Sequence, residues 1–199
     1  MSALPKARSM TEEEFLAREA SAETRSEYFH GEIFEMSGGT SDHAKITMNL
    51  ARRIANQLEG KPCFPLVNDM MIKIEATGLL TYPDIVVVCE EKYKDATERV
   101  LLTPSVLIEV TSDSTERYDR TTKLRHYKLI PSLREYLVVA QSEPVIDIYS
   151  RLPDESWGHS SVAGLEASLS IFTIDVHLPL TSVYERVNLP DFTDGPRPR

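Results

Sequence analysis

The chain has 199 residues and a formal net charge of −9, with 41% hydrophobic and 27% charged side chains. This balance is typical of one soluble globular domain, and the acidity argues against a general nucleic-acid coat protein, which would be basic. No apolar run approaches the roughly 18–20 residues that span a bilayer, and residues 1–10 contain no apolar signal-peptide core. We therefore expect a cytoplasmic protein with no membrane contact.

Two patterns predict the N-terminal elements, after a loose arm at residues 1–10. Thr11 and Glu14 have capping-box spacing, which predicts a helix from about Thr11 to Ala20. Apolar residues alternate on either side of His30-Gly31, which predicts a hairpin over residues 25–36.

The clearest helix follows this hairpin. Its apolar stripe recurs at every fourth residue, at Ile46, Leu50, Ile54 and Leu58. Ser41 is placed to cap the start of the helix, and Gly60 ends it.

The rest of the chain predicts short strands around one further helix. Strands are expected near residues 63–67, 69–75, 83–89, 106–111, 133–140, 144–151 and 156–162. The charged stretch 90–99 predicts a loop with a helical turn, and a helix is expected from Ser114 or Thr115 until Pro131 stops it. A short closing helix follows at 180–187. These elements predict one α/β domain over residues 11–187, with a disordered, proline-containing tail at 188–199.

The two cysteines, Cys63 and Cys89, belong to no Cys-x-x-Cys pair and have no histidine at zinc-site spacing. Two isolated cysteines do not form a disulfide framework, which agrees with a reducing compartment. Cys89 ends an apolar run, so we expect it to be a buried free thiol.

Two of the apolar runs carry one carboxylate each, Asp84 after Pro83 and Glu109 within Val106–Thr111. Pro-Asp is common in turns, so Asp84 either marks the entry to a strand or has a chemical role. Glu109 either lies at a sheet edge, pairs with an arginine or binds a metal, because glutamates are rarely buried alone. Mg²⁺ prefers such hard oxygen ligands, and a metal activates water for phosphodiester hydrolysis.

The segment 117–128 is basic although the chain is acidic. Five Lys and Arg residues stand there against one acid: Arg117, Arg120, Lys123, Arg125 and Lys128 against Asp119. A local basic face suits a site that meets anions in one place, and we expect Arg117, Arg120 and Arg125 to contact nucleic acid. Lys123 either lies on a solvated helix face, paired with Asp119 at i,i+4, or holds the attacking water and stabilises the transition state.

Two residues further upstream are candidates for the same site. Glu32 follows the hairpin turn and is either an exposed hairpin residue or a third carboxylate of the site. His43 opens the long helix and is either a solvated first-turn histidine or a contact to phosphate or water.

An ordered set of short motifs runs through the chain. It comprises Gly31-Glu32, Ser41-Asp42-His43, residues 83–87, 107–110, 112–115 and 119–123, Tyr127 and Arg134-Glu135-Tyr136. From about Met10 to Val187 this set resembles the Uma-type putative restriction endonuclease family, a bacterial family long carried as a domain of unknown function, within the PD-(D/E)XK nuclease superfamily.

The resemblance implies a restriction-endonuclease-like α/β core, with a mixed central sheet flanked by helices and preceded by the N-terminal helix and hairpin. It implies Asp84 and Glu109 as metal ligands. The superfamily's lysine usually lies two residues past the second acid, where this chain has Thr111, so the resemblance moves that role to Lys123. Glu32 and His43 match the family's upstream positions.

The leading interpretation is an endonuclease that cuts DNA with Mg²⁺ or Mn²⁺. The acidic body and Thr111 leave a second interpretation open, a nuclease-fold module that binds DNA or protein without turnover. A third is a homodimer, in which the hairpin 138–149 pairs with a second copy across a sheet edge.

Overall fold

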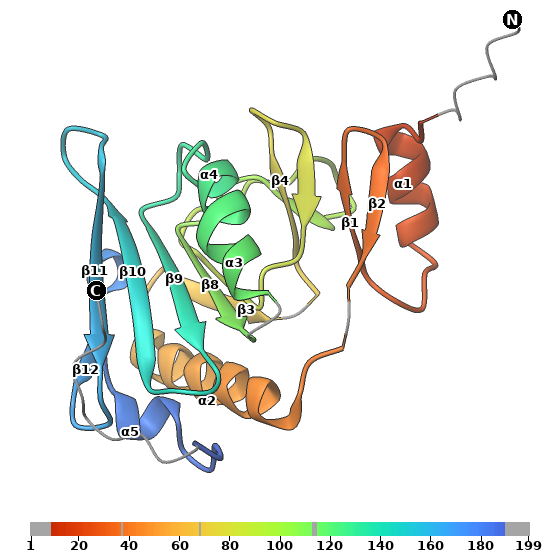
Figure 1. The fold of residues 1–199 in the computed structure, drawn as a ribbon. Coiled ribbons are helices and arrows are strands. Elements are labelled where there is room, and N and C mark those ends of the chain that lie inside the picture. Colours follow the sequence, from red (N-terminus) through yellow and green to blue (C-terminus); the bar gives the residue numbers. More distant parts are fainter. Residues whose placement is uncertain (1–8, 37, 68, 113–114, 190–199) are drawn as a thin grey trace, which may run out of the picture.

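The computed structural model describes residues 9–36, 38–67, 69–112 and 115–189, which form an α/β fold (Figure 1). In chain order the elements are α1 Glu12–Glu19, β1 Ser26–Phe29, β2 Glu32–Glu35, α2 Ser41–Leu58, β3 Phe64–Val67, β4 Met71–Ile74, β5 Leu79–Thr81, β6 Ile85–Val88, β7 Val100–Leu101, β8 Val106–Thr111, α3 Glu116–Tyr118, the π-helical η1 Asp119–Lys123, α4 Leu124–Tyr127, β9 Glu135–Ala140, β10 Val145–Arg151, β11 Trp157–Ala163, β12 Ser168–Ile171, the 3₁₀ turn η2 Phe172–Ile174, β13 Val176–Pro179 and α5 Leu180–Val183.

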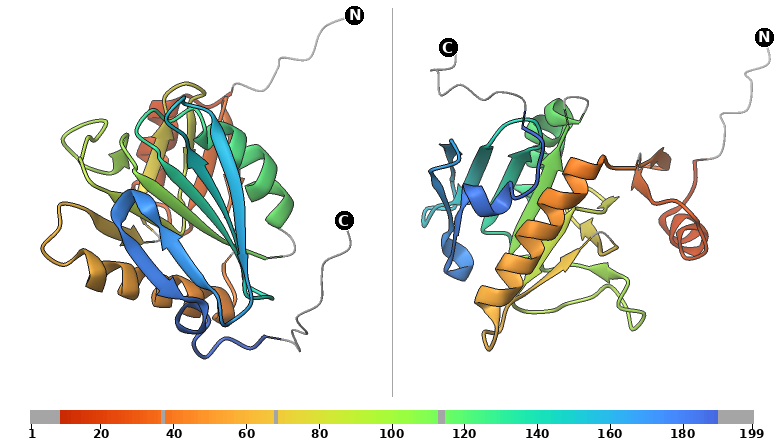
Figure 2. Two further views of the ribbon diagram at one scale, coloured as in Figure 1. Left: turned by 90° about the vertical axis from the view of Figure 1, so that its left-hand side faces the viewer. Right: turned by 90° about the horizontal axis from the view of Figure 1, so that it is seen from below.

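The larger sheet has six strands in the order β11-β10-β9-β8-β6-β3, and β8 and β9 run parallel while the other pairs are antiparallel. Its strands alternate their side chains between two faces. On one face, Val87 and Ile108 pack against the α2 stripe that the sequence predicts, together with β12, β13 and α5. Helix α2 crosses this face in Figure 2.

The opposite face carries the helical segment 116–127, formed by α3, η1 and α4, and the second sheet. Val86, Leu107 and Val138 point to this side and pack with Tyr127 and Ile130. The second sheet has the order β2-β1-β5-β4-β7 and is also mixed, because β4 and β7 run parallel. The fold therefore contains two mixed sheets and a small antiparallel sheet of β12 and β13, where the family resemblance implies a mixed central sheet flanked by helices.

The N-terminal predictions are confirmed. Thr11 and Glu14 form the capping box of α1, and β1 and β2 form the hairpin, with Phe29 paired to Glu32. The predicted cap of α2 is wrong by one residue. Thr40 is the cap, because its side chain accepts a hydrogen bond from the His43 backbone N–H at 3.1 Å, and Ser41 is already helical. Residues 90–99 form a loop with one hydrogen-bonded turn, in which the Glu98 N–H donates to the Asp95 carbonyl at 3.2 Å, and this turn does not extend into a helix.

The hairpin of β9 and β10 lies inside the sheet. Strand β8 pairs with one side of it and β11 with the other. The prediction that this hairpin pairs with a second copy across an edge is therefore wrong, since β11 occupies the edge.

The prediction of a free Cys89 thiol is also wrong, since Cys63 and Cys89 form a disulfide. Strands β3 and β6 are antiparallel with Phe64 opposite Val88, which brings the flanking cysteines together. This pairing depends on sheet register, and 26 residues separate the two cysteines in sequence.

The predicted arm and tail lie mostly outside the described residues, at 1–8 and 190–199. Their inner ends are bonded to the body, because the Tyr28 hydroxyl donates to the Met10 carbonyl at 2.9 Å and the Asn188 N–H donates to Asp42 at 3.4 Å. Among the helices described, none is long and apolar enough to cross a bilayer.

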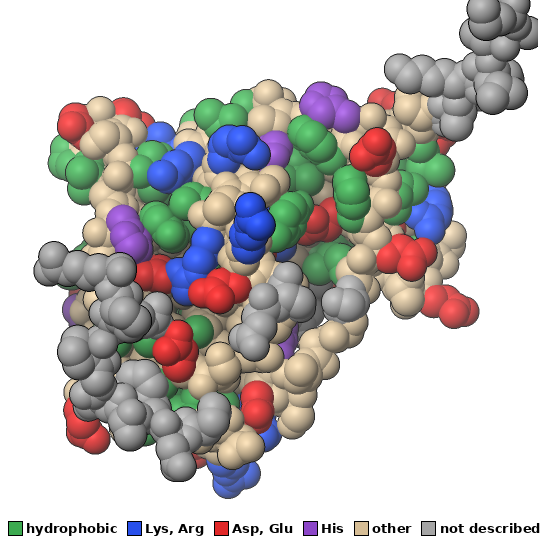
Figure 3. Space-filling model, viewed as in Figure 1, with side chains coloured by type: hydrophobic (Ala, Val, Ile, Leu, Met, Phe, Trp, Pro, Cys, Tyr) green, Lys and Arg blue, Asp and Glu red, His purple; other side chains and the backbone are tan. Residues whose placement is uncertain are grey.

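Several exposed apolar side chains lie close together on the surface. Figure 3 shows them gathered between the helical segment 116–127 and the hairpin β1–β2. Phe34 on β2 is 47% exposed and Met48 on α2 is 64% exposed. Clustered exposure of this kind marks a binding surface.

Candidate active site

Glu109 lies on β8, and Asp84 immediately precedes the adjacent strand β6. The register pairs Ile85 of β6 with Ile108 of β8 in antiparallel fashion, so Asp84 and Glu109 oppose each other at the next position. Opposed side chains leave the same face of a sheet, and here it is the face that the helical segment 116–127 covers. Glu109 is only 4% exposed.

Lys123 and Tyr127 on the helical segment reach Glu109. The Lys123 ammonium donates to Glu109 Oε1 at 2.9 Å, and the Tyr127 hydroxyl donates to the same oxygen at 2.7 Å. Lys123 is 5% exposed, so it does not lie on a solvated helix face. The structure therefore places Lys123 beside the acid that the sequence singles out. Tyr127 is a second donor to that acid.

Asp119 is buried one turn before Lys123, and the two lie within the π-helical η1. The wider turn of a π-helix, often found at functional sites, keeps both side chains on the buried side. Asp119 Oδ1 lies 3.6 Å from the Lys123 ammonium, so the surface ion pair considered from the sequence is an interior one. Thr111, in place of the usual lysine, hydrogen-bonds Thr115 at 3.1 Å. Burial raises the pKa of Asp119, and both threonines act in the opposite direction.

Glu27 of β1 is the residue that the sequence analysis missed. It is buried, and its Oε1 lies 3.2 Å from the Lys123 ammonium. Thr81 and Tyr118 donate to its two oxygens at 2.5 and 2.9 Å. The sequence signal for Glu27 was a carboxylate inside a predicted strand, which is the same signal that singled out Glu109.

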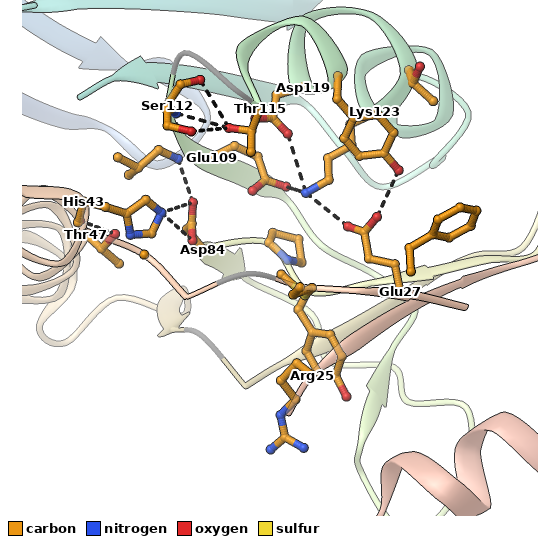
Figure 4. A pocket seen from close by; sticks show the side chains of 18 of the residues that line it. Arg25, Glu27, His43, Thr47, Asp84, Glu109, Ser112, Thr115, Asp119 and Lys123 are labelled. Atoms are coloured by element: carbon orange, nitrogen blue, oxygen red, sulfur yellow. Dashed lines mark hydrogen bonds and ion pairs between the residues drawn. The ribbon is translucent and has the colours of Figure 1, made fainter. Parts of the chain in front are cut away.

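His43 lies at the first turn of α2 and reaches Asp84 (Figure 4). Its Nε2 is 3.1 and 3.2 Å from the two Asp84 oxygens, one of which also accepts the Val110 backbone N–H at 2.7 Å. The hydrogen bond to Asp84 raises the pKa of His43, against the opposing effect of burial. His43 therefore holds Asp84 in one orientation.

Glu27, Glu109 and Asp119 surround one ammonium, that of Lys123, so the buried cluster has more negative than positive charge. Burial raises the pKa of Glu109, and the Asp119 and Asp84 carboxylates raise it further. The Lys123 ammonium acts in the opposite direction. Burial lowers the pKa of Lys123, but the three carboxylates outweigh it and the net shift is upward. Lys123 is therefore protonated, and its charge compensates the carboxylates that surround it.

Hard oxygen donors suit Mg²⁺, and Asp84 and Glu109 are the pair that could hold it. No group of three or more His, Cys, Asp or Glu side chains in the described part of the chain is arranged as a metal site. Mg²⁺ commonly uses one or two carboxylates and fills its other positions with water and phosphate oxygens. The two acids thus fit the ion.

The remaining predicted site residues lie apart from this cluster. Glu32 is exposed on β2 and does not line the cavity above the cluster. Arg120 is bound to Glu116 and Asp147, so its contact with nucleic acid would require breaking those ion pairs. Arg117 and Arg125 are exposed, and Arg125 lines the cavity.

A cavity of about 1490 Å³ opens onto these side chains. His43, Asp84, Glu109 and Lys123 line it together with the hairpin β1–β2 and helix α2. Figure 4 shows His43 and Asp84 pointing toward each other below Glu109 and Lys123, with Glu27 on the opposite side of the ammonium. The cavity has room for a large ligand, and Asp84 is the more accessible of the two carboxylates, because Glu109 is almost completely buried.

Comparisons with known proteins agree with this fold. The chain is 35% identical over 148 residues to the uncharacterized protein slr1290 of Synechocystis sp. (strain PCC 6803), across 74% of this chain and 77% of that protein. It is 31% identical over 161 residues to sll1609 of the same strain, across 80% and 91% respectively.

A crystal structure of "a putative nuclease belonging to DUF820" from Anabaena variabilis has the same fold. The comparison of the two structures gives a TM-score of 0.72 at 17% sequence identity, and it covers 88% of this chain and 97% of that one. Residues 12–181 match the Uma2 family, described as "Putative restriction endonuclease". This match, with the two relatives and the shared fold, shows that the chain belongs to the Uma2 family.

Proposed function

We propose that the protein is a Mg²⁺-dependent endonuclease that hydrolyses DNA phosphodiester bonds, with Mn²⁺ as an alternative ion. The observation that carries the proposal is the pair Asp84 and Glu109, opposed on adjacent strands at a cavity, with Lys123 bonded to Glu109 at 2.9 Å. The restriction-endonuclease-like core that the family resemblance implies supports the same chemistry.

Each side chain has a defined task in this proposal. Asp84 and Glu109 hold the ion, which when bound polarises the phosphate and activates water. His43 and the Val110 N–H fix the Asp84 carboxylate. The protein supplies preorganised charge here, which is the main source of rate in such reactions.

Lys123 binds Glu109 and Glu27 closely, while its contact to Asp119 is longer, at 3.6 Å. One ammonium N–H thus has only this long contact among the described residues. We assign this N–H to the attacking water or to a phosphate oxygen, while another N–H of the same ammonium keeps the bond that positions Glu109.

The test is cleavage of supercoiled plasmid and, separately, of a circular single-stranded DNA with Mg²⁺ or Mn²⁺, against EDTA. Asp84→Asn and Glu109→Gln keep the size of the side chain and remove its charge, and we expect each to lower the cleavage rate by about 100-fold or more. Asp175→Asn is the matched control, because Asp175 is exposed far from the cavity.

Two results would contradict the proposal. One is a wild-type protein that neither cuts nor binds either ion, and the other is cleavage that Asp84→Asn leaves unchanged. Metal-independent DNA binding without cleavage would instead support the binding module, which Thr111 and the carboxylates around Lys123 favour.

A further inference from the structure

The wall of the cavity is strongly apolar. Of the nine large apolar side chains exposed among the described residues, five line it. These five are Phe34, Met48, Val67, Tyr118 and Leu129. They come from separate elements that surround the cavity, so the apolar surface belongs to the cavity as a whole. Such a concentration of exposed apolar surface requires a ligand with apolar faces.

The same wall has few available positive charges. The described lining residues include three Lys or Arg side chains against five acids; the basic ones are Arg25, Lys123 and Arg125, and the acidic ones Glu27, Glu35, Asp84, Glu109 and Asp119. Arg25 pairs with Asp69 at 3.1 Å, and Lys123 is held by carboxylates. Arg125 is thus the one without a described ion-pair partner.

These two properties disfavour duplex DNA as the ligand inside the cavity. A duplex hides its bases and presents one phosphate charge per roughly 1.7 Å of helix axis, so proteins position it chiefly through phosphate contacts. An acidic wall with apolar side chains cannot provide many such contacts. An unpaired strand also carries phosphate charge, but its binding depends less steeply on phosphate contacts than duplex binding does, and its bases can stack on aromatic side chains.

Aromatic side chains occur on several sides of the cavity. Phe29 and Phe34 line it from the hairpin, Tyr82 from the residues before β6, and Tyr118 from α3. The Arg25 guanidinium lies over the Tyr82 ring, 5.5 Å from its centroid. Tyr82 is buried and Phe29 is partly buried, so Phe34 and Tyr118 are the rings that a base can reach. Stacking of bases on such aromatic side chains contributes to single-strand binding.

We propose that the cavity binds a single-stranded stretch of nucleic acid, with its bases against Phe34 and the apolar wall and one phosphate at Asp84 and Glu109. This inference rests on the proposed nuclease function of the same site, and it names the substrate class. The protein would act on unpaired strands, such as gaps, ends or bubbles, rather than on intact duplex.

The experiment measures binding by fluorescence anisotropy in EDTA, which prevents cleavage. The probes are one labelled oligonucleotide sequence as single-stranded DNA, as single-stranded RNA and as annealed DNA duplex, at one salt concentration. We expect single strands to bind more tightly than the duplex, and the comparison of DNA with RNA identifies the natural strand.

Phe34→Ala is the diagnostic variant, and Phe172→Ala is its matched control. Phe172 is 78% exposed and lies outside the cavity. Loss of one stacked base weakens binding by about 5- to 150-fold, which we expect for Phe34→Ala only. Met48→Ala, on the exposed face of α2 where alanine favours the helix, is expected to weaken binding in the same direction and serves if Phe34→Ala does not fold.

The outcomes separate this inference from the nuclease proposal. Duplex binding as tight as single-strand binding, or folded Phe34→Ala and Met48→Ala variants that bind like Phe172→Ala, overturns it, even if Asp84-dependent cleavage is found. A stable dimer that Phe34→Ala makes monomeric also overturns it, because a second copy would then cover the wall. Phe34-dependent single-strand binding without cleavage supports the inference and contradicts the nuclease proposal.

Discussion

Replacing Lys123 with methionine tests whether its ammonium compensates the buried carboxylates. Methionine keeps the length of the side chain and removes the charge. It would leave Glu27, Glu109 and Asp119 without the cation that now lies 2.9–3.6 Å from each. Removing one partner from a buried ion pair costs about 3–5 kcal/mol of unfolding free energy. For a chain of this size that corresponds to a fall in Tm of about 6–20 °C.

The assays are thermal and urea unfolding in EDTA, with Lys61→Met as the control. Lys61 pairs with the exposed Asp175, and such surface pairs contribute about 0–1 kcal/mol. The double variant Lys123→Met/Glu27→Gln should lose less stability than the sum of the single variants, with a coupling of about 0.5–3 kcal/mol. Additive losses, or a Lys123→Met variant as stable as Lys61→Met, would refute the role assigned to the ammonium.

The pH dependence of Lys123→Met provides a second check. Burial raises the folded-state pKa of Glu109 and of Asp119. A carboxyl whose folded pKa is raised stabilises the fold at low pH and loses that contribution as the pH rises through the folded pKa. The stability deficit of the variant should therefore shrink from pH 8 to pH 5, where protons replace the lost ammonium.

Two further predictions concern His43 and the disulfide. Asp84 raises the pKa of His43 above its ordinary 6.5. The contact between protonated His43 and Asp84 therefore stabilises the fold fully below pH 6.5, and this contribution is lost as the pH rises through the folded-state pKa. His43→Gln should lower Tm in EDTA more at pH 6 than at pH 9, and an equal loss at both would contradict this. The disulfide closes a loop with a separation of 26 residues, worth about 3.5 kcal/mol, so dithiothreitol should lower Tm by about 7–14 °C. The Cys63→Ser/Cys89→Ser variant should not respond to it, and two free thiols in the untreated, denatured protein would disprove the bond.

Local patterns in the sequence predict much of the fold. The apolar stripe from Ile46 to Leu58 predicts α2, and the run Val106–Thr111 has the same bounds as β8. The capping box at Thr11 is likewise read from four neighbouring residues. These features are accessible because backbone periodicity and caps depend on residues within one or two turns.

The candidate site was only partly accessible from sequence. Asp84 and Glu109 are conspicuous because each is a charge beside an apolar strand. Glu27 has an equally buried position, yet its strand pattern did not show that β1 would lie beside the helical segment 116–127. The ion pairs of Arg120 were hidden for the same reason, whereas the exposed position of Glu32 is one of the two alternatives that the sequence left open.

The sequence by itself determined the main helices, most of the strands, the two carboxylates beside apolar strands and the basic segment with Lys123, but not the short strands β5, β7, β12 and β13. Only the tertiary structure decided that Glu27, Glu109 and Asp119 share one ammonium, that Cys63 faces Cys89, and that an apolar cavity opens onto the site. The physical reason is distance along the chain. Periodicity records which face of an element is buried, whereas the partners of a buried charge come from segments that only sheet register and packing bring together.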